Sequence, residues 1–157
     1  MRHLAFIGLF VTAVTLCGFE TTHAQRAATK FVDRYIADQA RSEDSEEYRK
    51  ARQLLRGDIN GDGKIDLVFL YTLEGMGGGN NYAQHLAVLL GSGKTYKHAA
   101  DEIVGGKLFR NATLKSLARS TINLDIIEYR ENDASCCPSR KAKARYTFLN
   151  NKLTEVK

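Results

Sequence analysis

Several features on which functional assignments usually rest are missing from this sequence of 157 residues. It has no Cys-x-x-Cys pair, no Ser/His/Asp or Cys/His arrangement of the kind that nucleophilic enzymes use, and no internal repeat. Past its first 24 residues it has no apolar run near the ~20 residues that cross a bilayer. These absences argue against a membrane-spanning helix, a repeat array and an enzyme with a recognisable nucleophile.

Two other motifs are incomplete. Residues 91–95 read Gly-Ser-Gly-Lys-Thr, like the end of a phosphate-binding P-loop, but the upstream glycine of that motif is replaced by Val88. His85 and His98 are the only histidines beyond the leader, and neither has a carboxylate or a nucleophile next to it in sequence. We therefore expect a hairpin turn at 91–95 and packing roles for both histidines.

Residues 1–24 have the pattern of a secretory leader. A short basic start precedes the apolar run Leu4–Leu16, and Ala24 ends an acceptable small-residue cleavage site. The alternative is lipid attachment at Cys17. Lipid-attachment sites have Gly or Ala before the cysteine, whereas this sequence has Leu16 there. We expect cleavage, which leaves residues 25–157 as a single domain in the periplasm or outside the cell.

The charge is mildly basic. The formal net charge is +5, and removal of the leader leaves it unchanged because one basic and one acidic residue are lost. The basic residues are scattered along the sequence, which argues against nucleic-acid binding. The excess of basic over acidic residues is consistent with a role in solubility or with binding to an anionic envelope surface. We expect a monomer whose partner is an envelope protein or polymer.

Hydrophobic periodicity predicts one helix near the start of the mature chain. Over 27–41 the apolar residues recur on one helical face, as in an amphipathic helix: Phe31, Tyr35, Ile36 and Ala40. The acidic stretch 42–47 is expected to be an exposed connection. Residues 48–56 are ambiguous between helix and strand.

The residue pattern from position 65 onward predicts β-strands. Residues 65–73 are apolar on both faces, as in a central strand. Short glycine- or asparagine-rich turns separate the other candidates: 82–90, 97–104, 113–118, 122–129 and 144–149. The expected fold is α+β, with an N-terminal amphipathic helix packed on a mainly antiparallel β-sheet meander that carries a calcium-binding hairpin loop.

Residues 58–66 place oxygen-bearing side chains around a tight glycine turn. The candidate ligands are the side chains of Asp58, Asn60, Asp62 and Asp66 and the carbonyl of Lys64. Ca²⁺ prefers roughly 6–8 oxygen ligands, and three carboxylates this close would repel one another without a cation. An EF-hand is excluded because its bidentate Glu is replaced by Phe69 and a strand follows. The alternative is a metal-free turn, which Asn-Gly and Asp-Gly favour.

The pattern Asp-x-Asn-Gly-Asp-Gly-x-x-Asp-Leu at 58–67 resembles the calcium loop of FG-GAP and VCBS-type repeats, which occur in integrin-like β-propellers. The resemblance covers residues 56–72. It implies a loop between two antiparallel strands that holds a structural Ca²⁺ through the side chains of Asp58, Asn60, Asp62 and Asp66 and a backbone carbonyl. One copy cannot form a propeller. Without the Glu ligand we expect a dissociation constant of about 10⁻⁴–10⁻³ M.

More loosely, the mature chain resembles a group of small bacterial periplasmic or secreted proteins. The shared segments are Gly-Asp-x-Asn-Gly-Asp-Gly at 57–63, Leu-Glu-Gly-x-Gly-Gly-Gly-Asn-Asn-Tyr at 73–82 and Cys-Cys-Pro at 136–138. This resemblance implies a location in the envelope and no activity.

The glycine-rich segment after the central strand is a candidate ligand loop. Four glycines in five positions lose much conformational entropy on ordering, and they let a ligand approach the backbone. The candidate contact residues are Glu74, Gly77, Gly78, Gly79, Asn80, Asn81 and Tyr82. If 66–74 is one strand, this loop lies ~27 Å from the calcium loop. A flexible surface loop is the alternative.

Cys136 and Cys137 are adjacent, and Pro138, the only proline, follows them. They can pair internally only as a vicinal disulfide, which would stiffen residues 131–139. Redox activity is the alternative, since a strained disulfide is easily reduced.

A small basic cluster lies after the cysteines, at Arg140, Lys141, Lys143 and Arg145. We expect these charges to protect a solvated edge strand. Contact with an anionic partner is the alternative.

The leading functional hypothesis is a non-catalytic, calcium-binding module of the bacterial cell envelope, acting as a binding or inhibitor domain through the glycine loop or the Cys-Cys loop. One alternative is a small enzyme: a thiol–disulfide protein that uses Cys136 and Cys137, or a hydrolase that uses two of Asp125, Glu128 and Glu131. Another alternative is a purely structural envelope protein.

Overall fold

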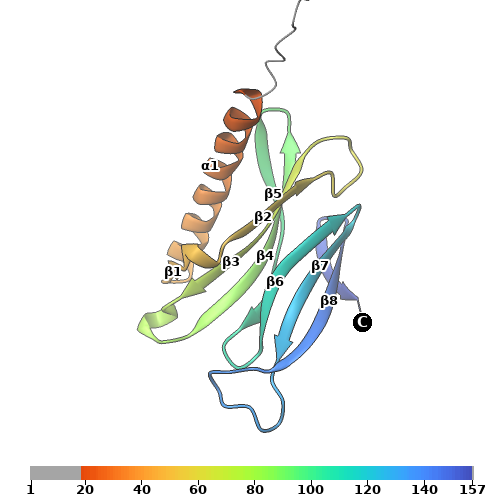
Figure 1. Cartoon of the computed structure of the whole chain (residues 1–157). Coiled ribbons are helices and arrows are strands. Elements are labelled where there is room, and N and C mark those ends of the chain that lie inside the picture. The colour runs from red at the N-terminus through yellow and green to blue at the C-terminus, as the bar shows by residue number, and fades with distance from the viewer. Residues whose placement is uncertain (1–18, 157) are drawn as a thin grey trace, which may run out of the picture.

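The computed structural model describes residues 19–156, so the first 18 residues of the predicted leader lie outside the described part of the chain. Across this range a long helix is followed by nine strands joined by short turns (Figure 1). Between residues 19 and 156 no helix is both long enough and apolar enough to span a membrane.

All strand pairings are antiparallel, in the order β1-β3-β4-β5-β6-β7-β8-β9, and β2 also pairs with β3. The strands are β1 (Glu46–Glu47), β2 (Gln53–Gly57), β3 (Asp66–Glu74), β4 (Tyr82–Ser92), β5 (Thr95–Gly106), β6 (Arg110–Ala118), β7 (Thr121–Glu128), β8 (Arg140–Leu149) and β9 (Lys152–Val156). A one-turn 3₁₀ helix occupies Arg49–Ala51, and Met76–Gly78 form a tight turn in which Gly77 has non-helical backbone angles. This confirms the predicted α+β fold with a mainly antiparallel sheet.

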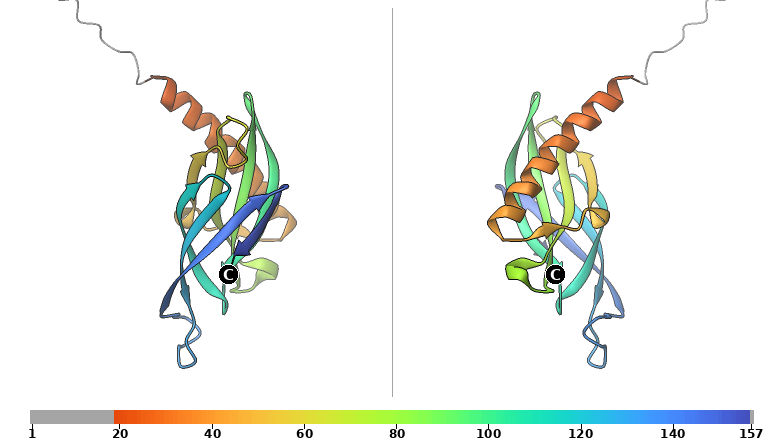
Figure 2. Two further views of the ribbon diagram at one scale, coloured as in Figure 1. Left: turned by 90° about the vertical axis from the view of Figure 1, so that its right-hand side faces the viewer. Right: turned by 90° about the vertical axis from the view of Figure 1, so that its left-hand side faces the viewer.

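Helix α1, Phe19–Ser42, lies across one face of the β3–β5 part of the sheet (Figures 1 and 2). Ala28, Val32 and Ile36 recur every four residues and are at most 1% exposed, and they pack on side chains of β3 and β4. Burial of a Val or Ile side chain contributes ~1.5–3 kcal/mol. Because isolated helices are marginal in water, this apolar stripe holds α1 in place.

Strand β3 is buried on both faces along its whole length except Glu74. One face meets α1 through residues such as Phe69, and the other meets the second half of the sheet through Val68 and Leu70. The prediction of a central strand is confirmed. Since β3 is unbroken, the 58–66 turn and the glycine loop lie at its opposite ends.

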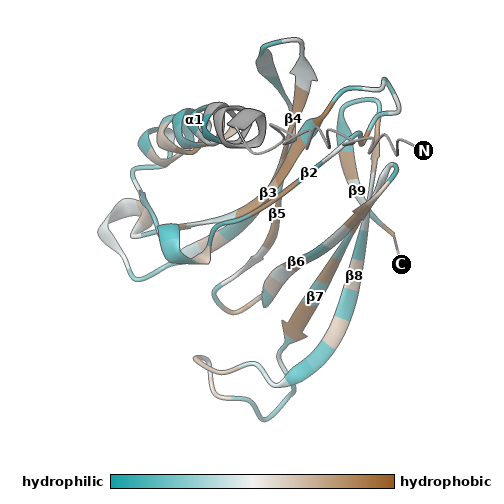
Figure 3. Cartoon of the chain, turned by 45° about the horizontal axis from the view of Figure 1, so that its top comes forward, coloured by the Kyte–Doolittle hydropathy of each residue, from teal (hydrophilic) through white to brown (hydrophobic). Residues whose placement is uncertain are grey.

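The sheet turns sharply between β5 and β6, which pair only at Gly106 and Arg110. A Cβ on Gly105 would lie 2.5 Å from the Gln84 side chain and 2.8 Å from the Arg110 carbonyl oxygen, so glycine is required for this close approach. Beyond the corner, β6–β9 fold back over the face of β3 and β4 that α1 leaves open (Figure 2). Figure 3 shows hydrophobic residues concentrated on β3 and β7, which border the core between the two halves.

Three local segments match expectation to different degrees. The acidic stretch 42–47 is more than an exposed connection, because β1 pairs with β3. The ambiguous stretch 48–56 divides between a 3₁₀ turn and β2. The expected edge strand is found for residues 140–144, which pair only with β7, whereas Arg145 also pairs with Val156 of β9 and is not at an edge.

Candidate functional site

The glycine-rich segment after β3 forms a closed loop. The N–H of Gly75 donates to the carbonyl of Asn81 at 3.0 Å, and the N–H of Gly77 donates to the carbonyl of Asp44 at 3.3 Å. Gly75, Gly77 and Gly78 have φ angles of 80°, 62° and 73°, in the left-handed region that favours glycine. The turn geometry itself therefore accounts for these glycines, and the contact with residue 44 fixes the loop against the end of α1.

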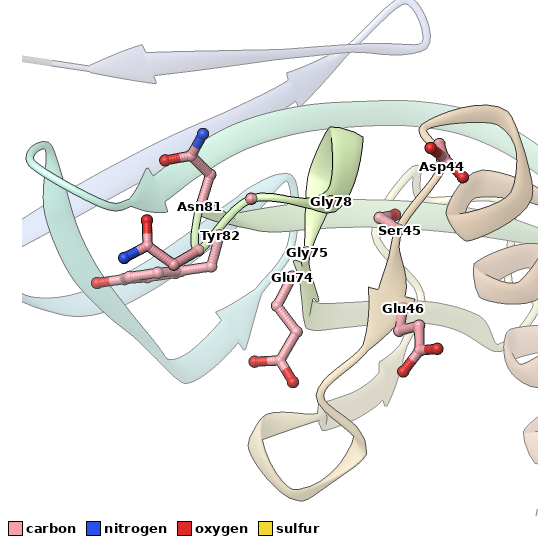
Figure 4. A pocket seen from close by; sticks show the side chains of 10 residues that line it. Asp44, Ser45, Glu46, Glu74, Gly75, Gly78, Asn81 and Tyr82 are labelled. Carbon is pink, nitrogen blue, oxygen red and sulfur yellow. The ribbon is translucent and has the colours of Figure 1, made fainter.

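This loop forms one wall of a pocket of about 670 Å³, and the segment that joins α1 to β1 forms the other (Figure 4). The pocket is lined by Asp44, Ser45, Glu46, Glu74, Gly75, Gly78, Gly79, Asn80, Asn81 and Tyr82. Six of the seven residues of the predicted ligand loop line it, and Gly77 does not. The structure therefore brings the predicted loop together with three residues that sequence analysis did not select: Asp44, Ser45 and Glu46.

Three exposed carboxylates, those of Asp44, Glu46 and Glu74, line the pocket, and none has an ion-pair partner among residues 26–156. Glu46 and Glu74 are directly opposite each other in the β1–β3 pairing, and Figure 4 shows their side chains extending to the same side. Like charges in this position, with Cβ atoms ~5 Å apart, destabilise a sheet. The ammonium of Lys107, at the rim, donates to oxygens of Asn80 instead.

The 58–66 turn between β2 and β3 is organised by hydrogen bonds from amides to side-chain oxygens. Oδ1 of Asp58 accepts from the amides of Gly61 at 2.7 Å and Asp62 at 3.1 Å, and its Oδ2 accepts from Gly63 at 2.8 Å. Oδ1 of Asn60 accepts from the amide of Asp62 at 3.0 Å. Asp58, Asn60 and Asp62 therefore lie together in one turn.

Asp66 has a different environment from the other predicted ligands. Its carboxylate is fully buried, with Oδ2 accepting from the amide of Ile59 at 2.9 Å and Oδ1 from the amide of Gly91 at 2.8 Å. It joins the base of the turn to β4. Lys64 pairs its ammonium with Asp62 at 3.0 Å, and the hydrogen bond from this side chain lowers the pKa of Asp62. The ammonium of Lys64 therefore neutralises part of the negative charge of the turn.

The donor chemistry of this turn fits Ca²⁺, although its acidic groups do not converge on one point. A carboxylate has about four acceptor sites, and the amide and ammonium contacts fill only part of them on Asp58, Asp62 and Asp66. In the described part of the chain, however, no three His, Cys, Asp or Glu side chains are grouped closely enough to hold a metal ion. An ion bound in this turn would compete with the ion pair between Lys64 and Asp62.

A partly buried polar network between α1 and the sheet was not foreseen from the sequence. Oδ2 of Asp101 accepts from the hydroxyls of Tyr35 at 2.9 Å and Tyr71 at 2.7 Å, and its Oδ1 lies 2.9 Å from Nδ1 of His85. Because a carboxylate only accepts, Nδ1 carries the proton. His85 is 4% exposed, and its Nε2 lacks a hydrogen-bond partner among the described residues and lies 3.9 Å from Glu43.

Burial, with the charge of Asp101 as the next cause, raises the pKa of both Tyr35 and Tyr71 well above the ordinary value. Both phenols therefore stay protonated and donate to Asp101. The expectation of a packing role for His85 is incomplete, since its ring is also a hydrogen-bond donor in this network. The only sequence signal was a histidine inside an otherwise apolar strand.

A second buried network ties the corner of the sheet to its last strand. Arg110, 5% exposed, donates to the carbonyl of Val104 at 2.7 Å, to the hydroxyl of Tyr146 at 2.8 Å and to both carboxylate oxygens of Glu155 at 2.8 Å. The hydroxyl of Tyr146 also donates to Glu155 at 2.9 Å. These contacts hold β6, β8 and β9 together, and Arg110, Tyr146 and Glu155 also line a shallow hollow of about 350 Å³ on the surface.

The sulfur atoms of Cys136 and Cys137 are in contact, as in a vicinal disulfide, in the exposed loop between β7 and β8. The carboxylate of Asp133 organises this loop by accepting from the amides of Arg130 and Ser139, each at 2.8 Å. The hydrogen bond from the Arg130 amide is the main cause of a lowered pKa of Asp133. The loop is therefore held by a carboxylate as well as by the cysteine pair.

The carboxylates considered for a hydrolase are not assembled into a pair. Asp125 and Glu128 lie on opposite faces of β7, since burial alternates along the strand. Asp125 pairs with Lys115 at 3.2 Å, and Glu128 pairs with Arg140 at 2.7 Å. Glu131 is exposed in the following loop. The structure therefore does not support this version of the enzyme hypothesis.

Comparisons of the chain with protein-family models, with curated proteins and with solved structures found no significant match.

Proposed function

We propose that the protein is a non-catalytic binding module of the bacterial cell envelope, exported by its leader, whose glycine-loop pocket receives a cationic group of a partner protein. The observation that carries this proposal is a pocket with three carboxylates that lack ion-pair partners among the described residues. Two of them stand directly opposite each other in the sheet. A cation between them would remove the repulsion that the free protein retains.

The lining of the pocket favours binding over chemistry. It consists of carboxylates, amides, one hydroxyl, one phenol and glycine backbone, with neither a histidine nor a thiol. Its acidic residues are exposed rather than enclosed, as expected for contact with a side chain of another protein. A lysine or arginine of a partner would pair with Glu46 and Glu74, and the amide oxygens of Asn80 and Asn81 would accept its remaining N–H groups.

Calorimetric titration with short peptides tests this proposal. We expect an arginine- or lysine-rich peptide to bind and a glutamate-rich peptide of equal length to fail. Replacement of both Glu46 and Glu74 by Gln should weaken binding by about tenfold or more, because two exposed ion pairs are worth ~0.2–1 kcal/mol each and more when coupled in a network. The same double variant should unfold at a slightly higher temperature, because the repulsion across β1 and β3 is removed.

The matched control replaces Glu102 and Glu131, both exposed and outside the pocket, by Gln. It removes the same charge and should leave peptide binding within about twofold of the unmodified protein. Equal weakening in both double variants would assign the binding to net charge and would contradict the proposal.

A second proposal concerns the 58–66 turn, which we suggest holds a structural Ca²⁺. Its support is an all-oxygen donor set with free acceptor capacity, together with the resemblance to FG-GAP and VCBS-type loops. The ligands would be the side chains of Asp58, Asn60, Asp62 and Asp66 and the carbonyl of Lys64, and the carboxylates would have to move closer together than they lie here. The ion would stabilise the turn between β2 and β3 and would take no part in binding at the glycine loop.

Thermal melts with about 10 mM Ca²⁺ or with a chelator test this second proposal. For a dissociation constant of about 10⁻⁴–10⁻³ M, Ca²⁺ should raise the free energy of unfolding by ~1.4–2.7 kcal/mol. Asp58→Ala and Asp62→Ala should abolish the increase. Lys64→Ala should enlarge it, because the ammonium that competes for Asp62 is gone. Identical melts in Ca²⁺ and chelator would rule the ion out and leave the pocket proposal intact.

A further inference from the structure

Three basic side chains form a row on the outer face of β8. Lys141, Lys143 and Arg145 occupy alternate positions, are exposed and point to the same side of the strand. Successive charges on one face of a strand are ~6.8 Å apart. Lys141 and Lys143 lie where β8 pairs only with β7, but Arg145 also pairs with Val156 of β9, so protection of a sheet edge does not explain the whole row.

The row is not neutralised within the described residues. Two carboxylates lie on the neighbouring strand β7, but Asp125 pairs with Lys115 and Glu128 pairs with Arg140. Neither Lys141, Lys143 nor Arg145 has an ion-pair partner in residues 26–156. The outer face of β8 therefore carries three positive charges that form no ion pair with these residues, although Asp125 stands opposite Lys143 in the pairing of β7 with β8.

Two adjoining hollows, of about 510 and 490 Å³, lie along this face, and Asp125 and Lys143 line both. Hydroxyl and amide side chains stand among the cations: Thr113 in one hollow, and Ser116 and Asn123 in the other. No aromatic side chain lines either hollow. The face belongs to the second half of the sheet, away from α1, and shares no lining residue with the glycine-loop pocket (Figure 1).

We propose that the outer face of β7 and β8 is a docking surface for a linear acidic polysaccharide. The row of cations pairs with carboxylates spaced along the chain, and the interspersed hydroxyl and amide groups bond to sugar hydroxyls. A single-stranded nucleic acid fits less well, because its bases need aromatic stacking platforms. A lipid surface is the alternative that the test decides, because Ile127 and Val156 are exposed beside the row. This proposal does not depend on the function proposed for the glycine loop.

The test is a titration of the protein with a defined polyuronate such as alginate at about 50 and 200 mM salt. We expect binding that weakens with salt, because counterions are released from the polymer. The triple variant Lys141→Gln, Lys143→Gln, Arg145→Gln should bind about tenfold or more weakly and should show a smaller salt dependence. Its thermal melt should be nearly unchanged, since these side chains are exposed.

The control triple variant replaces Arg56, Lys94 and Lys97, which are exposed and lie on other strands and the β4–β5 turn, by Gln. It removes the same charge and should bind alginate within about twofold of the unmodified protein. Equal weakening in both triple variants, or none in the first, overturns the proposal. Tighter binding of single-stranded DNA or of anionic vesicles through the same row would overturn the polysaccharide assignment.

Discussion

Replacing Asp101 by alanine should lower the free energy of unfolding by about 3–5 kcal/mol, the largest effect that we expect from a single substitution. Three donors, the hydroxyls of the half-buried Tyr35 and the buried Tyr71 and the Nδ1–H of the buried His85, would lose their acceptor at once. Each unsatisfied buried polar group costs ~1–3 kcal/mol. The network joins α1 to β3, β4 and β5, so its loss should also loosen the helix.

Urea denaturation of a graded series measures this effect. Tyr35→Phe removes one donor and leaves Asp101 with two, so it should cost only ~1 kcal/mol. Asp101→Asn, which retains one carbonyl acceptor, should lie between the two and remains measurable if the alanine variant fails to fold. A loss below ~1 kcal/mol for Asp101→Ala would show that water replaces the carboxylate and that the network does not hold the helix.

Replacing Arg110 by methionine should cost about 2–4 kcal/mol. Methionine fills much of the same volume, but the carbonyl of Val104 and the hydroxyl of Tyr146 lose a donor, and the carboxylate of Glu155 loses its bidentate partner. We place the cost below the upper range for buried pairs because the side chain of Glu155 is 38% exposed and water screens it.

The matched control is Arg145→Met, which removes an exposed arginine from the same sheet and should change stability by less than ~0.5 kcal/mol. Denaturant unfolding of both variants gives the comparison. Equal losses would mean that the buried contacts of Arg110 contribute no more than a surface charge, contrary to the geometry at the corner of the sheet.

The parts of the fold that the sequence predicts are those with a clear local period. Residues 122–126 alternate between apolar and polar side chains, and burial alternates with them in β7. Residues 65–73 are apolar throughout and form the doubly buried β3. By contrast, β9 was missed and β8 was predicted to begin four residues late, because basic and polar residues dominate 140–143 and 150–156 and carry no apolar period.

The glycine-loop pocket was predictable only in part, because some of its features depend on contacts between residues that are distant in sequence. The glycines of the loop stand out locally, but three of them are explained by left-handed turn geometry rather than by a ligand. What makes the pocket acidic is the placement of Glu46 opposite Glu74, and this depends on the register of a two-residue strand. The network of Asp101 likewise joins residues 16 to 66 positions apart, beyond the reach of any periodic pattern.

The most direct test of the central claim is an amide chemical-shift titration of the protein with an arginine-rich peptide. The account predicts that the largest shifts fall on residues 44–46 and 74–82, and that they disappear when Glu46 and Glu74 are replaced by Gln. Shifts that instead centre on other surfaces, or that persist in this double variant, would contradict the assignment of the glycine-loop pocket as the binding site.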